Sequence, residues 1–280
     1  MSRTPSRTQE ASPGSARPVL LALDFGGTKT ALTVADPHGT RLQDRTIQAD
    51  SDLRRALDAA RTLLAGREPL AVGVSTIGIP GPDGVALAPN IPGWDRLPLE
   101  RELAKEFPRS PVRVATDVKA AAAHEYASGA LAGCDPGLYV NLGTGLAVAV
   151  VAHGTVLAGR HGASGEIGYN LRGLDDVGRT DHLPLEAAVS GKALQQGVPT
   201  REFLTELAFH LVNLTIAVDP ERIVVGGGMV RSWHALHDPL RRALDAAVPY
   251  PPPLAPAAHP YDAPLLGALT LAVEAARPRT

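Results

Sequence analysis

Two segments of the chain repeat one pattern, and this repeat is the feature that most constrains the fold. Residues 20–40 and residues 138–155 each contain an apolar strand, a glycine turn with a Gly-Thr pair, a second apolar strand and a closing His-Gly-Thr. The spacing differs by one residue between the two copies. A duplicated unit is the economical explanation. We therefore predict two similar β-hairpins whose glycine turns face each other across a cleft and grip a polyphosphate from both sides.

The pattern of apolar residues predicts a mixed α/β chain around these hairpins. We predict strands at residues 19–24, 30–35, 40–47, 70–75, 112–115 and 222–225, and helices at residues 53–65, 119–131, 184–195, 201–218 and 263–276. A proline-rich stretch at residues 251–253 is predicted to be an extended connector. The 280 residues are enough for two modest cores, so we expect two lobes.

Composition and charge exclude several classes of protein. The net charge of −2 gives no broad positive field, so nucleic acid is not expected as a partner. Cys134 is the single cysteine, which rules out an intramolecular disulfide and a multi-cysteine zinc site and favours a cytoplasmic location. Residues 1–18 are polar and predicted to be a disordered tail. Because no run reaches the roughly 18 apolar residues of a membrane span, we predict a soluble protein with no membrane partner.

The first glycine turn carries residues suited to binding phosphate and a metal ion. A carboxylate at a strand end is followed by two glycines, a hydroxyl and an ammonium: Asp24, Gly26, Gly27, Thr28 and Lys29. Glycine lets backbone N–H groups approach phosphate, and a nearby acid can hold Mg²⁺ directly or through water. The spacing is not that of a Walker A loop. An ordinary hairpin turn is the alternative, and the second copy at Gly143, Thr144 and Gly145 favours phosphate binding.

Further candidates follow in the second half of the sequence. Asp117 lies at a strand-to-helix junction, where it can cap the helix or accept a proton from an attacking hydroxyl as general base, and both roles can coexist. Glu166 can bind sugar hydroxyls or be a solvent-facing loop acid. Glu186 lies in a predicted first helical turn, where the helix dipole alone favours an acid. Gly226, Gly227 and Gly228 follow a strand and form either an approach to adenosine or a plain turn.

Taken in this order, the motifs resemble those of the ROK family of repressors, open reading frames and sugar kinases. The resemblance runs from about Val19 to the closing helix. It implies an α/β, two-lobed actin-like ATPase fold, ribonuclease H-like, with duplicated βββαβα units around a nucleotide cleft. We predict a small lobe at residues 19–116 and a large lobe at residues 117–280, with the closing helix 263–277 packing back on the small lobe.

The resemblance also implies a role for each candidate residue. The turn from Asp24 to Lys29 is similar to the first phosphate loop, with Asp24 holding Mg²⁺ through water. Gly143, Thr144 and Gly145 match the second phosphate loop, Gly226, Gly227 and Gly228 match the adenosine segment, and Asp117 matches the catalytic base. The implied substrate-binding residues are Gly78, Asn90, Thr116, Asp117, Glu166, Tyr169 and Glu186.

Three departures from the family pattern concern the acceptor pocket. The interval between Glu166 and Glu186 is short and contains no cysteine, so no structural zinc site is expected. Tyr169 stands where the family often has a histidine, which removes a metal ligand and a sugar contact. Thr116 and Lys119 replace two asparagines that usually flank the base. These departures leave the residues that match the phosphate loops unchanged and alter the acceptor pocket, so an acceptor other than glucose is considered as well.

The resemblance implies ATP- and Mg²⁺-dependent transfer of a phosphoryl group to a primary hydroxyl of a hexose or hexose-like polyol. An amino sugar or a sugar-derived cyclitol is an alternative acceptor, and polyphosphate is an alternative donor. A non-catalytic sugar-sensing regulator is a further alternative, although only a short polar segment precedes the first strand in place of a helix-turn-helix domain. A homodimer is expected, since dimers are common in the family.

Overall fold

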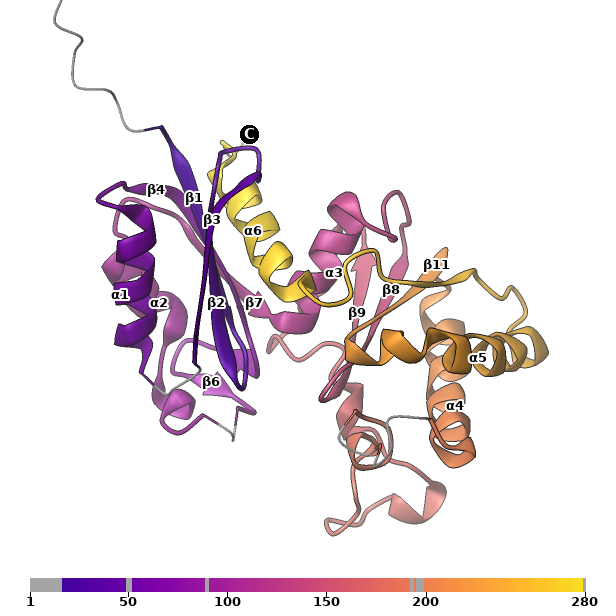
Figure 1. Ribbon diagram of the computed structural model, residues 1–280. Coiled ribbons are helices and arrows are strands. Elements are labelled where there is room, and N and C mark those ends of the chain that lie inside the picture. Colours follow the sequence, from indigo (N-terminus) through magenta and orange to yellow (C-terminus); the bar gives the residue numbers. More distant parts are fainter. Residues whose placement is uncertain (1–16, 49–51, 89–90, 192–193, 195–198, 279–280) are drawn as a thin grey trace, which may run out of the picture.

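Two five-stranded sheets with the same strand order form the framework of the chain (Figure 1). The computed structural model describes residues 17–48, 52–88, 91–191, 194 and 199–278. The first sheet runs β3-β2-β1-β4-β7 and the second runs β10-β9-β8-β11-β12. In each sheet the first three strands are antiparallel, and the last two continue parallel to the first strand of the unit. The structure confirms the duplicated unit predicted from the repeated hairpins.

The two units also share their order of helices and strands. The first contains β1 (Val19–Phe25), β2 (Lys29–Ala35), β3 (Arg41–Gln48), α1 (Leu53–Leu64), β4 (Pro69–Thr76), α2 (Leu99–Glu106), β7 (Val112–Thr116) and α3 (Asp117–Ser128). The second contains β8 (Gly137–Leu142), β9 (Leu146–Ala152), β10 (Thr155–Val156), α4 (Arg201–Val218), β11 (Arg222–Gly226), α5 (Trp233–Ala247), β12 (Leu254–Pro256) and α6 (Ala263–Ala276). Each unit therefore follows the order βββαβαβα, one strand and one helix longer than the predicted βββαβα.

Short elements connect the larger ones. A small hairpin of β5 (Ile79–Pro80) and β6 (Val85–Ala86), with the 3-10 turn η1 (Trp94–Arg96), lies between β4 and α2. The 3-10 turns η2 (Ile167–Tyr169), η3 (Leu174–Asp176) and η4 (Leu185–Ala187) lie between β10 and α4, and η5 (Gly228–Ser232) precedes α5. The predicted helix at residues 184–195 is wrong in its described part, because only the three residues of η4 are helical there and Gly191 N–H donates to Gly143 C=O at 2.8 Å.

Alternate residues of β1 pack against different layers, as the period of two of a strand requires. Leu21 and Leu23 belong to the core that the first sheet forms with α1 and α2. Leu20 and Ala22 point to the opposite face and pack in the core formed with α6. Asp24 shares the side of Leu20 and Ala22, so its carboxylate lies on the α6 side of the sheet.

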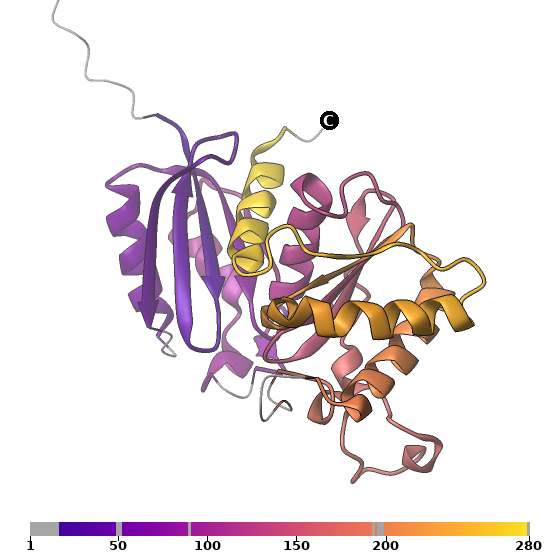
Figure 2. The ribbon, with the colours of Figure 1, turned by 45° about the vertical axis from the view of Figure 1, so that its right-hand side comes forward.

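The second sheet is covered in the same way. Val140 and Leu142 of β8 pack in the core with α4 and α5, whereas Tyr139, which precedes Val140, belongs to the core with α3. Helices α3 and α6 pack against each other between the two sheets (Figures 1 and 2). The closing helix α6 therefore follows the last strand of the second unit and returns to the first sheet.

Two glycines allow α6 to approach its neighbours closely. A Cβ at Gly267 would lie 2.1 Å from Ala120 C=O in α3, and a Cβ at Gly73 would lie 1.8 Å from Ala268 C=O. Atoms cannot occupy such distances, so any side chain at either position would force the helix away from its neighbour.

Gly267→Ala is expected to destabilise the chain by about 1–3 kcal/mol, because the new methyl group overlaps the backbone of α3. Urea unfolding would measure this as a lower midpoint with an unchanged slope. Gly173→Ala is the matched control, since nothing lies within 4 Å of its added Cβ. Equal midpoints for the two variants would contradict the close helix crossing.

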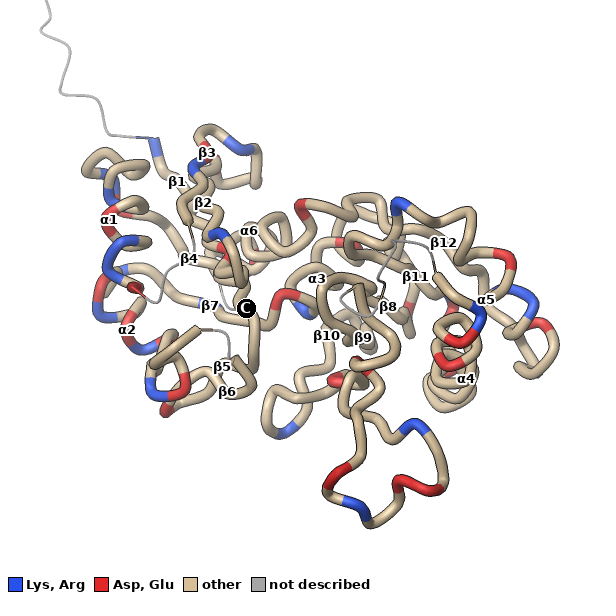
Figure 3. The backbone as a smooth tube through the Cα atoms, turned by 60° about the horizontal axis from the view of Figure 1, so that its bottom comes forward, with Lys and Arg blue, Asp and Glu red and all other residues tan. Residues whose placement is uncertain are grey.

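Charged residues lie mainly on the outer helices and loops. Lys and Arg alternate with Asp and Glu along α1, α2 and α5, while β4, β8 and β9 carry none (Figure 3). Among the described residues, no helix is both long enough and apolar enough to span a bilayer.

Candidate active site

The parallel strands of the first sheet bring the candidate residues to one edge. The register pairs Asp24 with Ser75, and Thr76 with Thr116. The carboxyl ends of parallel strands meet at the same edge of a sheet, which is where α/β folds place their ligands. Asp24, Ser75 and the start of α3 at Asp117 therefore lie together, although Ser75 is 51 positions from Asp24 and Asp117 lies near the end of the unit.

Asp24 has an unusual environment for a carboxylate. Ser75 Oγ donates a hydrogen bond to Asp24 Oδ1 at 2.7 Å. Burial raises the pKa of Asp24 to about 6, against the effects of the Ser75 hydrogen bond and Lys29, and the charge of Asp117 raises it further. The carboxyl group thus holds a proton more readily than an exposed aspartate, and a nearby cation would restore its charge.

Asp117 does not cap helix α3, which corrects one of the two predicted interpretations. The N-cap is Thr116, whose Oγ1 accepts a hydrogen bond from Lys119 N–H at 3.2 Å. Asp117 is the first helical residue, and its Oδ1 accepts from Val118 N–H at 2.8 Å. Burial raises the pKa of Asp117, and the hydrogen bond from Val118 and the charge of Lys119 oppose this. The capping function is filled by its neighbour Thr116, so the cap does not explain a half-buried acid at position 117.

Lys119 and Glu166 meet beside Asp117. Lys119 Nζ lies 3.9 Å from Glu166 Oε1, and their side chains are 7% and 27% exposed. Burial lowers the pKa of Lys119, and the charges of Glu166 and Asp117 counteract this effect. Burial raises the pKa of Glu166, as do Asp117 and Glu186, whereas Lys119 lowers it. Three acids and one buried lysine therefore interact in a single cluster.

Glu186 has a structural contact that sequence reasoning did not anticipate. Its Oε2 accepts a hydrogen bond from Leu146 N–H at 2.9 Å, directly after the second glycine turn. A Cβ at Gly145 would lie 2.5 Å from the same oxygen. One carboxylate oxygen of Glu186 thus holds the turn, and the other oxygen remains for the predicted contact with a sugar.

The second glycine turn packs against the predicted adenosine segment. Gly227 has a φ of +84°, and an added Cβ would lie 2.5 Å from Leu142 C=O and 2.8 Å from Gly143 N. A Cβ at Gly226 would lie 2.0 Å from the hydroxyl oxygen of Tyr139, so packing alone requires glycine there. Nothing lies within 4 Å of an added Cβ at Gly228, which leaves open space beside the turn.

The two predicted phosphate loops end their hairpins toward the same side of the molecule (Figures 1 and 2). Their internal hydrogen bonds differ in register: Gly26 N–H donates to Lys29 C=O at 3.0 Å, and Gly143 N–H donates to Gly145 C=O at 3.1 Å. Thr28, Lys29 and Thr144 are exposed. Their side chains and backbone are therefore accessible to a ligand.

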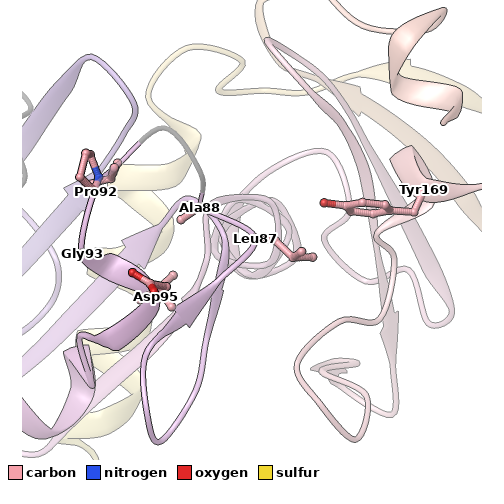
Figure 4. A pocket seen from close by; sticks show the side chains of 8 residues that line it. Leu87, Ala88, Pro92, Gly93, Asp95 and Tyr169 are labelled. Atoms are coloured by element: carbon pink, nitrogen blue, oxygen red, sulfur yellow. The ribbon is translucent and has the colours of Figure 1, made fainter. Parts of the chain in front are cut away.

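A pocket of about 330 Å³ lies between the two halves of the chain, within the size range of small-molecule sites. Tyr169 comes from the second half and points toward Leu87 of the first half (Figure 4). Asp117, Glu166 and Glu186 do not line this pocket. Tyr169 lines it and is close enough to Glu166 and Glu186 to interact with their charges. Burial, Glu186 and Glu166 all raise the pKa of the Tyr169 phenol. The remaining lining residues are Val85, Ala88, Ile91, Pro92, Gly93 and Asp95.

Several predicted residues fall elsewhere or outside the described part of the chain. Asn90 lies outside the described residues. Gly78 has a φ of +75°, and a Cβ there would lie 2.6 Å from Ala86 C=O, so it shapes the β5–β6 hairpin. Sequence reasoning missed Ser75, although a Ser-Thr pair ending an apolar run was a usable signal. Within the described ranges, no three His, Cys, Asp or Glu residues are grouped closely enough to hold a metal by themselves.

Asp24→Asn is expected to change how stability depends on pH. Because folding raises the pKa of Asp24 from 3.8 to about 6, protonation favours the folded state. This contribution is complete below about pH 4 and is lost as the pH rises through about 6, a change of about 3 kcal/mol. The free energy of unfolding of the wild type should therefore fall relative to the Asn variant over this interval.

Chemical denaturation at a series of pH values, without nucleotide or divalent cations, would measure this difference. The exposed Asp83→Asn serves as control and should track the wild type at every pH. A constant difference in the free energy of unfolding between wild type and Asp24→Asn across the interval would contradict the raised pKa of Asp24.

Comparisons with known proteins give the family. The model of the ROK family matches residues 20–202. The crystal structure of a ROK hexokinase from Thermus thermophilus has a TM-score of 0.74 and 29% identity, over 91% of this chain and 97% of that one. A ROK family glucokinase from Streptomyces griseus, in complex with glucose and AMPPNP, has a TM-score of 0.74 and 25% identity, over 91% and 99%.

Two further relatives show the range of the family. A kanosamine kinase from Amycolatopsis mediterranei is 30% identical over 251 residues, which is 75% of this chain and 80% of the relative. A ROK family transcriptional regulator, a homologue of the E. coli MLC protein, is 19% identical with a TM-score of 0.76, over 93% of this chain and 79% of that one. The likeness to the regulator is one of fold alone, and the other three relatives are sugar kinases.

Proposed function

Because this chain belongs to the ROK family, we propose that it is an ATP-dependent kinase that phosphorylates a primary hydroxyl of a hexose or hexose-like polyol. The observation that carries the proposal is the placement of two half-buried acids, Asp24 and Asp117, at one sheet edge, close enough for their charges to interact. Sugar kinases among its relatives, and the AMPPNP bound to one of them, support the reaction class and the use of ATP.

Asp117 is the proposed general base. Burial raises the pKa of Asp117, which makes its ionised carboxylate a stronger base toward the hydroxyl of an alcohol. The Val118 N–H bond fixes one carboxylate oxygen, which leaves the other oxygen to meet the acceptor hydroxyl. Most of the rate in phosphoryl transfer comes from positioning and electrostatics, so this fixed orientation is part of its contribution.

The glycine turns and Asp24 are proposed to hold the nucleotide. Backbone N–H groups of the two turns outside their internal hydrogen bonds, such as that of Gly27, suit the phosphates, while Gly26 N–H and Gly143 N–H hold the turns in shape. The exposed Lys29 and Thr144 add a charge and a hydroxyl. Asp24 fits a Mg²⁺ ion bound through water, because Mg²⁺ in such sites takes one or two carboxylates and completes its shell with phosphates and water. When bound, the ion would neutralise phosphate charge, and its own charge would favour the ionised form of Asp24.

A modified acceptor is the second candidate within the same chemistry. Tyr169 and Lys119 give the acceptor side a phenol and a buried ammonium. An amino sugar or a cyclitol is therefore an alternative acceptor to glucose. The kanosamine kinase among the relatives supports the inclusion of amino sugars. Coupled ADP release with glucose, glucosamine and an inositol as acceptors separates these possibilities.

Asp117→Asn is expected to lower kcat by about 10²–10⁴-fold, the usual contribution of a general base, while nucleotide binding stays close to that of the wild type. The coupled ADP-release assay measures kcat, and titration with ADP measures binding. Asp175→Asn, at an exposed position away from the site, is the matched control and should retain full activity. Full turnover by Asp117→Asn would overturn its proposed role.

A further inference from the structure

Lys119 is a buried cation at an unfavourable position. It lies in the first turn of helix α3, where the helix dipole disfavours positive charge. Its side chain is 7% exposed, and desolvating an ammonium carries a cost unless partners replace water. Neither helix stability nor solvation explains a lysine here, so its partners must be considered.

The contacts of Lys119 leave hydrogen-bonding capacity unused. An ammonium has three donors, and among the described residues the structure gives it one charged partner, Glu166, at 3.9 Å. A direct hydrogen bond between such groups would be about 2.8 Å long. The gap is thus too long for a direct bond, and an oxygen placed to one side could lie about 2.8 Å from both Nζ and Oε1.

A hydroxyl group is the ligand that suits both partners at once. Its O–H donates to Glu166 Oε1, and its oxygen lone pair accepts from Lys119 Nζ. A protonated amine could donate to Glu166, but it has no lone pair for Lys119 and would bring two positive charges together. The pair therefore distinguishes an alcohol from an ammonium at the same carbon.

We propose that Lys119 and Glu166 form a hydroxyl-selective subsite, in which one non-reacting hydroxyl of the acceptor bridges the ammonium and the carboxylate. The proposal rests on the proposed function and narrows its acceptor class to compounds with a hydroxyl, and no amino group, at the bridged carbon. Asp117, the nearest proposed catalytic group, adds a second negative charge beside Lys119, which together with Glu166 opposes the lowering of the Lys119 pKa by burial. Lys119 is thus a specificity-determining residue.

Isothermal titration calorimetry in the presence of ADP and Mg²⁺ tests the subsite without requiring turnover. The acceptors are glucose with glucosamine and 3-amino-3-deoxyglucose, and scyllo-inositol with scyllo-inosamine, at a pH where the amines are protonated. We expect the wild type to bind the preferred polyol at least about tenfold more tightly than one of its amino analogues. Lys119→Met, which removes the charge, should reduce that ratio by about tenfold.

Two other variants control for structural effects. Lys105→Met removes a lysine that pairs with Glu102 at 2.8 Å on the outer helix α2, and it should leave every ratio unchanged. Lys119→Arg keeps the charge but moves the donors, so it should weaken polyol binding while retaining discrimination against the amine. It also provides the test if circular dichroism finds Lys119→Met unfolded.

The outcomes separate the subsite from the proposed function. An equal polyol-to-amine ratio in the wild type and Lys119→Met, or loss of discrimination in the folded Lys119→Arg, overturns the subsite even if ADP is released. Selective binding that Lys119→Met abolishes, without ADP release for any acceptor, supports the subsite and overturns the kinase. If no compound of the panel binds to the wild type, both proposals are overturned.

Discussion

The parallel pairing of β1, β4 and β7 is the constraint on which the site depends. Because Asp24 lies opposite Ser75, and Thr116 lies opposite Thr76, the register brings three distant parts of the chain to one edge. A shift of one residue in β1 would turn Asp24 into the core with α1 and α2 and would expose Leu23 at the edge. The apolar alternation that fixes the core therefore also fixes where the acids lie.

The corresponding edge of the second sheet carries different residues. In register, Asn141 of β8 occupies the place that Asp24 has in β1, and Gly226 of β11 occupies the place of Ser75. One edge thus carries charge, and the other offers backbone close to Tyr139 and Leu142. Such a division suits a ligand whose metal-bound phosphates face one half while its uncharged part lies against the other.

Much of the fold was predictable because periodicity and turns are local signals. Helix α4 and helix α6 begin and end where the apolar pattern placed them, and the repeated hairpins predicted the duplication. The helix expected at residues 184–195 failed because the chain there follows a tertiary contact, Gly191 with Gly143, that no local pattern records. The added strand β12 depends likewise on pairing with β11.

The site was predictable in its residue types and less so in its contacts. Sequence alone left Asp117 between a cap and a base, and only the hydrogen bond of Thr116 resolves which residue caps the helix. The contact of Glu186 with Leu146 joins residues 40 positions apart. Lys119 was also not recognised as a site residue, because its role depends on the burial of its side chain and on its distance to Glu166. Neither the burial nor the distance can be read from the sequence.

The return of α6 to the first sheet means that the backbone crosses between the halves twice, once from β7 into α3 and once from β12 into α6. A single crossing would leave the halves free to swivel in any direction. Two adjacent crossings oppose twisting and sliding of one half against the other. The easiest relative movement of the halves is then a rotation about the line that joins the two crossings. Such a rotation would change the distance between Tyr169 and Leu87, which line the pocket from opposite halves, and would so widen or narrow it.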